Sequence, residues 1–86
     1  MDNEIYVIYD AAKNVYGTLL CYPNDATAMR DLNNEYRKEG SLFNTHPQDF
    51  ILYKIGSYAP LTGELIAYQT IERVCSCADF IEKGGK

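Results

Sequence analysis

Several features that mark whole classes of protein are missing from this sequence. It has no tryptophan, and none of its apolar runs approaches the roughly 20 residues that a membrane-spanning helix needs. Positive charge is scarce: eight Lys and Arg residues stand against twelve Asp and Glu residues, which gives a formal net charge of −4. Proteins that coat duplex DNA through its phosphates are normally basic. The composition therefore argues against a membrane protein and against a duplex-coating protein.

Cysteine is also scarce, and Cys21, Cys75 and Cys77 do not follow the spacing of a disulfide framework. We therefore expect free thiols in a reducing compartment, and the acidic N-terminus shows no signal-peptide pattern. Zinc motifs usually space their cysteines by two to four residues, more than separates Cys75 from Cys77. Small buried hydrophobic residues are thus favoured over a zinc site completed by Cys21 or His46. We expect no metal and no cofactor.

No motif for catalysis stands out. The glycines at expected turns are isolated, so the sequence contains no glycine-rich phosphate loop. The single histidine, His46, precedes Pro47 in a polar segment, and no Ser, Cys or Asp lies at a recognisable triad spacing from it. The carboxylates are scattered as on a solvated surface. The sequence therefore predicts a protein that is not an enzyme.

The patterns that are present predict a small α+β domain. With 86 residues, 47% of them hydrophobic, the chain can form one modest core. We expect a single domain over residues 1–82 and a loose tail at residues 83–86. Apolar and β-branched runs, turn signals and one helical periodicity predict an antiparallel sheet of four or five strands with one helix, in the order ββαββ(β). The expected strands are residues 4–10, 18–22, 50–55, 64–69 and, at the sheet edge, 71–77; the helix is 25–39, the polar loop 41–49 and a helical turn 78–82.

Both faces of these strands are apolar. Alternation places Ile5, Val7, Tyr9, Phe50, Leu52, Leu65 and Ala67 on one face, and Tyr6, Ile8, Ile51, Tyr53, Ile55, Ile66 and Tyr68 on the other. One helix covers only one face, and an antiparallel sheet with a wet face should show polar residues there. The second face must meet another subunit, another protein, a ligand or the C-terminal segment. We expect a homodimer that buries one of the two faces.

Two sets of residues are candidates for binding. Eight of the eleven aromatic residues are tyrosines, which serve as base-stacking surfaces in single-strand-binding proteins but more often form core or interface. Tyr6, Tyr53 and Tyr68 are the candidates for stacking or for a dimer interface. Basic residues of the expected helix and of the third strand are the candidates for nucleic-acid binding: Arg30, Arg37, Lys38 and Lys54.

Three segments in order, EIYVIYD, YPNDATAMRDL and DFILYKIGSYAPLTGEL, resemble a known family. Their order and lengths, over residues 5–68, are similar to the small nonstructural protein of gokushovirus-type microviruses, which are small circular single-stranded DNA phages. The resemblance implies a phage protein made in the host bacterial cytoplasm and absent from the virion. It also implies a role in genome replication or in the switch to single-stranded DNA synthesis and packaging. The matching positions carry no established role: Tyr9, Asp10, Asn24, Asp25, Arg30 and Lys54.

These observations lead to two functional hypotheses. In the first, the protein binds the viral single-stranded DNA. In the second, it is a protein–protein adaptor that binds a phage or host replication protein without touching nucleic acid. Phosphate contacts release counterions, so a steep salt dependence of binding would separate the first hypothesis from the second.

Overall fold

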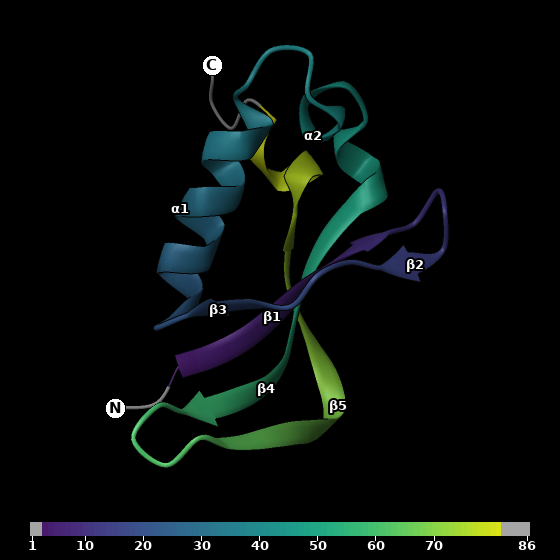
Figure 1. Cartoon of the computed structure of the whole chain (residues 1–86). Coiled ribbons are helices and arrows are strands. Elements are labelled where there is room, and N and C mark those ends of the chain that lie inside the picture. Colours follow the sequence, from purple (N-terminus) through teal and green to yellow (C-terminus); the bar gives the residue numbers. More distant parts are fainter. Residues whose placement is uncertain (1–2, 82–86) are drawn as a thin grey trace.

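An antiparallel sheet and one long helix dominate the computed structural model, which describes residues 3–81 (Figure 1). This confirms the expected α+β class. Along the chain the elements are β1 (Asn3–Asp10), β2 (Val15–Tyr16), β3 (Leu20–Tyr22), α1 (Asp25–Tyr36), α2 (Leu42–Thr45), the 3-10 helix η1 (Pro47–Asp49), β4 (Phe50–Ala59), β5 (Glu64–Ser76) and the 3-10 helix η2 (Cys77–Phe80). The expected tail, residues 83–86, lies outside the described residues.

Strand β1 lies in the interior of the sheet. It pairs with β4 on one side and with the short strands β2 and β3 on the other. The outer strand beyond β4 is β5, so the order is β2-β1-β4-β5, with β3 paired to β1 beside β2. All pairs are antiparallel. The first connection, expected to be a plain turn, contains β2, which closes a hairpin on β1 through Asn14 at φ 57°.

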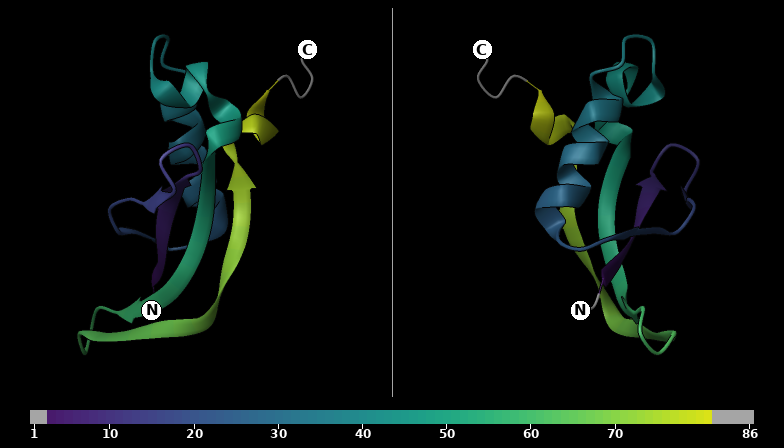
Figure 2. Two further views of the ribbon diagram at one scale, coloured as in Figure 1. Left: turned by 90° about the vertical axis from the view of Figure 1, so that its right-hand side faces the viewer. Right: turned by 60° about the vertical axis from the view of Figure 1, so that its left-hand side comes forward.

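The β4–β5 hairpin is longer and more bent than expected. The segments expected as two strands, 64–69 and 71–77, form the single strand β5, and β4 continues through the expected turn to Ala59. Register shifts between the two strands mark the bend, beyond which the distal hairpin turns under the start of β1 (Figure 2). A Cβ on Gly56 would lie 2.4 Å from the carbonyl oxygen of Ile66. Glycine therefore permits the close approach of the two backbones at the bend.

Helix α1 begins at Asp25, as expected, but ends three residues early. The side chain of Asn24 caps its start by accepting from the Thr27 N–H at 2.8 Å. At the other end, the Ser41 hydroxyl and the Asn44 amide donate to the carbonyls of the last helical turn at 3.0 Å each. Because side chains of the following segment satisfy these carbonyls, the helix ends at Tyr36. The segment expected as a polar loop contains α2 and η1.

The main core lies between α1 and one face of the sheet. Its buried residues are Tyr6, Ala28, Leu32, Phe50, Leu52, Cys75 and Cys77. The expected assignment of residues to the two sheet faces is therefore wrong between strands. It placed Tyr6 on one face and Phe50 and Leu52 on the other, whereas all three lie in this core. In the structure Ile8 of β1 pairs with Leu52 of β4, which puts the even-numbered residues of both strands under the helix. Alternation assigns faces within a strand, but the pairing register decides which faces coincide.

Candidate interaction surfaces

The sheet face away from α1 carries an apolar hollow of about 550 Å³, here called the open-face groove. Its floor includes Val7 and Ile55, and the bent part of β5 and the β2–β3 connection form its walls. The lining residues are Val7, Tyr16, Gly17, Leu19, Ile55, Ala67, Tyr68 and Ile71. Leu19 and Ile71 are 58% and 38% exposed, so the walls present apolar side chains to solvent.

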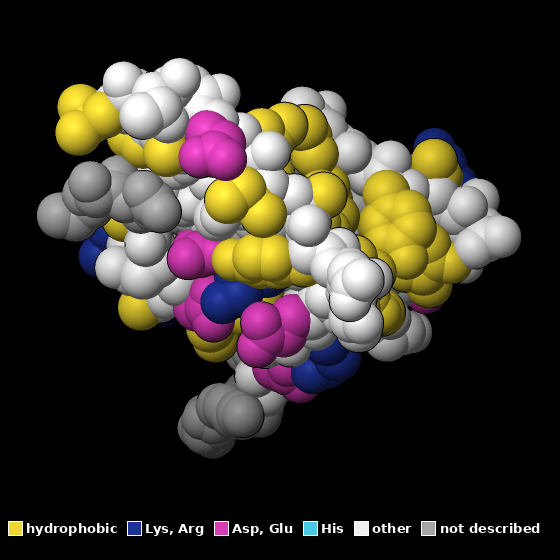
Figure 3. Space-filling view, turned by 90° about the horizontal axis from the view of Figure 1, so that it is seen from below, with side chains coloured by type: hydrophobic (Ala, Val, Ile, Leu, Met, Phe, Trp, Pro, Cys, Tyr) yellow, Lys and Arg dark blue, Asp and Glu magenta, His cyan; other side chains and the backbone are white. Residues whose placement is uncertain are grey.

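Three tyrosine rings continue the groove at the β2 end of the sheet. Tyr9 and Tyr16 have ring centroids 4.6 Å apart, and Tyr53 lies within 6.3 Å of both. We call these three residues the tyrosine cluster. Seen from below, hydrophobic side chains form a broken band from the β4–β5 hairpin on the left to the β2 side on the right (Figure 3). Most charged side chains lie along one margin of that band.

The structure separates the three candidate stacking tyrosines. Tyr6 has no exposed surface, because its ring lies in the core beneath α1. It therefore has no surface with which to stack on a base or to contact a second copy, which corrects the expectation for this residue. Tyr53 belongs to the tyrosine cluster, and Tyr68 lines the open-face groove. Tyr16, which sequence reasoning missed, joins both surfaces; only the general surplus of tyrosine pointed to it.

The Tyr68 hydroxyl is itself engaged. It donates to Oε1 of Glu4 at 2.7 Å, and this bond, followed by burial and by the charge of Glu4, raises the pKa of Tyr68. The contact ties the middle of β5 to the beginning of β1, so that the wall of the open-face groove is held in place.

The four basic candidates do not form one patch. On the helix side of the sheet, the ammonium of Lys54 lies 3.2 Å from Oδ1 of Asp25 and 3.7 Å from Oε1 of Glu72. Burial alone would lower the pKa of Lys54, but the hydrogen bond and charge of Asp25, with the other nearby carboxylates, raise it. Lys54 is therefore a protonated side chain whose charge is already matched within the protein.

The other three basic candidates lie on or next to α1. Lys38 pairs with Glu35 at 2.9 Å. Arg30 and Arg37 are exposed and make no ion pair with another described residue. Since α1 covers one face of the sheet and the tyrosine cluster lies on the other, these arginines and the exposed tyrosine rings lie on opposite sides of the protein.

The side-chain contacts of Asp25 connect α1 to strands β1, β4 and β5. The Tyr6 hydroxyl donates to Oδ1 of Asp25 at 2.6 Å, and Lys54 joins the same oxygen to Glu72 of β5. The hydrogen bond from Tyr6 is the main cause that lowers the pKa of Asp25; burial opposes it, and Lys54 adds to it. These contacts hold the start of α1 against the sheet.

The remaining candidates for metal binding or catalysis are dispersed. Cys75 and Cys77 are buried in the core, which confirms their expected role as small hydrophobic residues, whereas Cys21 is exposed on β3. Burial raises the pKa of both core thiols, to about 11 for Cys75 and about 12 for Cys77. The hydroxyl oxygen of Thr45 lies 2.9 Å from Nδ1 of His46. Within residues 3–81, no three His, Cys, Asp or Glu side chains gather as a metal site would require.

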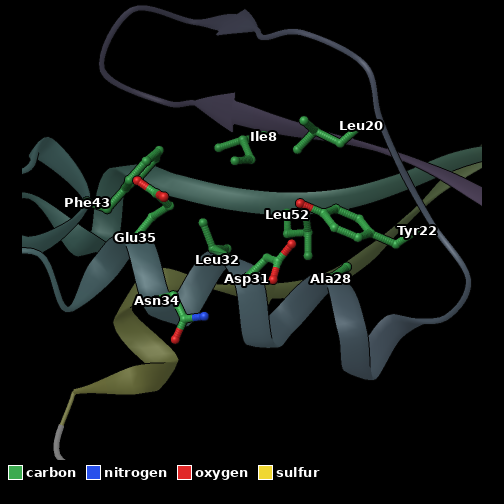
Figure 4. Close-up of a pocket in the computed structure, with 10 residues that line it drawn as sticks. All are labelled: Ile8, Leu20, Tyr22, Ala28, Asp31, Leu32, Asn34, Glu35, Phe43 and Leu52. Carbon is green, nitrogen blue, oxygen red and sulfur yellow. The ribbon is translucent and has the colours of Figure 1, made fainter.

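A second hollow, the helix-side cleft, lies between α1 and strands β1 and β3 (Figure 4). It measures about 490 Å³ and has an apolar floor with carboxylates at its mouth. The lining residues are Ile8, Leu20, Tyr22, Ala28, Asp31, Leu32, Asn34, Glu35, Phe43 and Leu52. The sequence contained no motif for this cleft, because its residues come from five separate elements.

Among the described residues, no helix is long and apolar enough to cross a membrane.

Comparisons with known proteins identify the family of the chain. No curated protein and no solved structure matches the chain. The model of a family described as "Phage ORF5 protein" matches residues 3–80, which include every strand and helix described above. This confirms the phage part of the resemblance noted in the sequence. The chain therefore belongs to the Phage ORF5 protein family.

Proposed function

We propose that this phage accessory protein is an adaptor that binds a phage or host replication protein through the open-face groove. The observation that carries the proposal is the open-face groove on the face opposite α1, whose walls keep the apolar side chains of Leu19 and Ile71 exposed to solvent. Its neighbours Leu65 and Ile66 on β5 are also exposed, at 61% and 49%. Contiguous apolar surface of this kind marks interaction sites on soluble proteins. Covering it would contribute about 25 cal/mol per Å² of buried apolar area.

The charge distribution favours a protein partner over a nucleic acid. The net charge is −4, and Lys54 and Lys38 are already paired with carboxylates. Arg30 and Arg37 lie on the opposite side of the protein from the exposed tyrosines. A single-strand-binding groove combines positive charge with stacking rings on one surface. The resemblance to gokushovirus nonstructural proteins supports action in the host cytoplasm during replication or the switch to single-stranded synthesis and packaging.

The proposal is tested by co-expressing the chain with the replication protein of the same phage and measuring retention after nuclease treatment. Leu19→Asp and Ile71→Asp place a charge in the groove walls, and we expect each to abolish retention. Leu61→Asp is the matched control, because Leu61 is 90% exposed in the β4–β5 turn and does not line the groove. Equal retention by the groove variants and the control would overturn the proposal.

A second copy of the chain is the rival occupant of the open-face groove. The homodimer expected from the sequence would bury the same apolar side chains in a two-fold contact. Sedimentation equilibrium of the chain alone distinguishes the two occupants. A dimer that becomes monomeric on Leu19→Asp would assign the groove to self-association, and a wild-type monomer leaves the surface free for another protein.

Single-stranded DNA binding is the second candidate function, and the tyrosine cluster favours it. Stacking of a base on an aromatic ring contributes about 1–3 kcal/mol, and Tyr16 is half exposed. The test is fluorescence anisotropy of a labelled oligothymidine at low salt, repeated with Tyr16→Ala. Binding that falls with salt and with loss of the ring would favour this function. No binding up to about 100 micromolar protein, beyond the usual non-specific range, would refute it.

A further inference from the structure

We propose that the helix-side cleft binds an extended segment of another protein in which a bulky apolar side chain is flanked by Lys or Arg. This site lies on the opposite face of the sheet from the open-face groove, so it does not depend on the adaptor proposal. The partner is defined by its chemistry: one apolar anchor, cationic neighbours and a backbone without secondary structure of its own.

The first support is the shape of the cleft. Its floor is built from Ile8 of β1, Leu20 of β3, Leu32 of α1, Phe43 of α2 and Leu52 of β4. Leu32 and Leu52 are core residues with 5% and 1% exposure, so the hollow reaches down to the main core. Figure 4 shows these side chains on both sides of the space between α1 and the strands. A volume of about 490 Å³ is ample for one large aliphatic or aromatic side chain.

The end of α1 is held by a contact on the side away from the cleft. The end of α1 packs toward the C-terminal side of the sheet, where Tyr36 meets Phe80 of η2 with ring centroids 5.7 Å apart. The cleft lies on the other side of α1, toward β1 and β3.

The second support is continuity beyond the cleft. A further hollow of about 340 Å³ begins on the other side of Ile8, Leu20 and Phe43, which line both spaces. It extends to Val15 and Gly17 at the β1–β2 hairpin. Two adjoining hollows fit an extended chain with successive side chains better than they fit a single compact ligand.

The third support is the charge at the mouth. Asp31 and Glu35, one helical turn apart on α1, both line the cleft. Asp31 makes no ion pair with another described residue. Glu35 lies in the last turn of α1 and pairs with Lys38 at 2.9 Å, so Asp31 carries the unmatched negative charge of the mouth. Burial, then the charge and the hydrogen bonding of Asp31, and last the charge of Glu35, raise the pKa of Tyr22 in the same mouth.

The negative charge at the mouth of the cleft distinguishes between possible ligands. An apolar small molecule would gain nothing from the carboxylate of Asp31 at the entrance, and an acidic segment would be repelled by it. A segment with Lys or Arg beside its apolar anchor places opposite charges together at a solvent-exposed rim, which strengthens encounter and orientation. The observed combination of apolar floor and acidic rim is thus complementary to a basic, apolar segment.

The test is an NMR titration of the full chain, labelled with nitrogen-15, with three short peptides. They share Leu and Phe anchors and differ only in the flanking residues, which are Lys, Gln or Glu. We expect the Lys peptide to bind most tightly and to shift the amides of Leu20, Leu32 and Phe43. The amides of Ala67 and Ile71 in the open-face groove should not move.

Two variants sharpen the test. Asp31→Asn should weaken binding of the Lys peptide by about two- to fivefold, the range of one exposed charge pair, and should not change the Gln peptide. Glu64→Gln, an equal change of charge at the far hairpin, is the matched control and should have no effect. Equal binding of the three peptides, or no shift at the cleft with the Lys peptide, would overturn the proposal. Leu19→Asp, which alters the open-face groove, should leave peptide binding unchanged. The outcome of this titration is therefore independent of the outcome of the adaptor test.

Discussion

Replacing Tyr6 with Phe tests whether the contacts of Asp25 hold the helix on the sheet. The substitution removes one hydroxyl and leaves a fully buried ring in place. That hydroxyl donates to Oδ1 of Asp25 at 2.6 Å, and Asp25 is the first residue of α1. The lost bond therefore lies between strand β1 and the start of the helix.

The expected loss follows from the chemistry of this bond. A hydrogen bond to a charged group contributes about 1.5–3 kcal/mol to stability. The Asp25 side chain is 43% exposed, so water replaces part of what is lost, and Phe leaves no buried donor without a partner. We therefore expect Tyr6→Phe to lower the free energy of unfolding by about 1–2 kcal/mol at neutral pH.

The pH dependence provides a second test of the same bond. The Tyr6 hydroxyl lowers the pKa of Asp25 below its ordinary value of 3.8, against the opposing effect of burial. A lowered folded-state pKa contributes stability that is present above the unfolded value and is lost as pH falls through the folded value. The difference between wild type and Tyr6→Phe should thus be largest near neutral pH and should shrink below about pH 4.

The assay is urea unfolding followed by circular dichroism at neutral and acidic pH. Tyr53→Phe is the matched control, because the Tyr53 hydroxyl makes no hydrogen bond with another described residue. We expect the control to change the free energy of unfolding by less than about 0.5 kcal/mol. Equal losses for the two variants, or a loss for Tyr6→Phe that does not change with pH, would show that this bond does not hold the helix.

Four further predictions concern the thiols, the bend in the hairpin and the segment after α1. Cys21 should react with a thiol reagent in the folded protein, whereas Cys75 and Cys77 should react only after denaturant is added, and elemental analysis should find no zinc. Since burial raises the pKa of the two core thiols to about 11 and about 12 from 9.0, the unfolded state releases these protons first. The free energy of unfolding should therefore fall as pH rises above 9, and urea titrations at neutral and alkaline pH will check this. Gly56→Ala should destabilise the protein by about 1–3 kcal/mol, because its Cβ would collide with the backbone of β5. Gly40→Ala, with φ +87° and no atom within 4 Å of the added carbon, should cost about 1–2 kcal/mol from backbone strain alone, as measured by thermal unfolding.

Local patterns were sufficient for the main strands and the start of the long helix, but not for β2, α2 and η1. Alternation and β-branched residues placed β1, the start of β4 and both parts of β5, because each strand presents its own side chains in a period of two. The one helical periodicity placed the start of the helix at Asp25, where the structure has it. The burial of Cys75 and Cys77 agrees with the expectation of small hydrophobic residues, which followed from a spacing that does not suit zinc.

Contacts between distant segments decided the candidate sites. Lys54 was a candidate for binding phosphate, but the fold places it between Asp25 and Glu72, which are 29 and 18 positions away in the sequence. The same fold places Tyr6 in the core and brings Tyr16 beside Tyr53. No local pattern encodes such pairs of residues.

By itself, the sequence determined that this is a small acidic α+β protein with one helix and more apolar sheet surface than that helix can cover. The tertiary structure alone decided which side chains share a face, where the hairpin bends and where the two hollows open. The physical reason is that secondary structure depends on neighbours along the chain, whereas strand register depends on pairing between strands. A shift of one residue in that pairing exchanges the buried and exposed faces, and with them the residues available for binding.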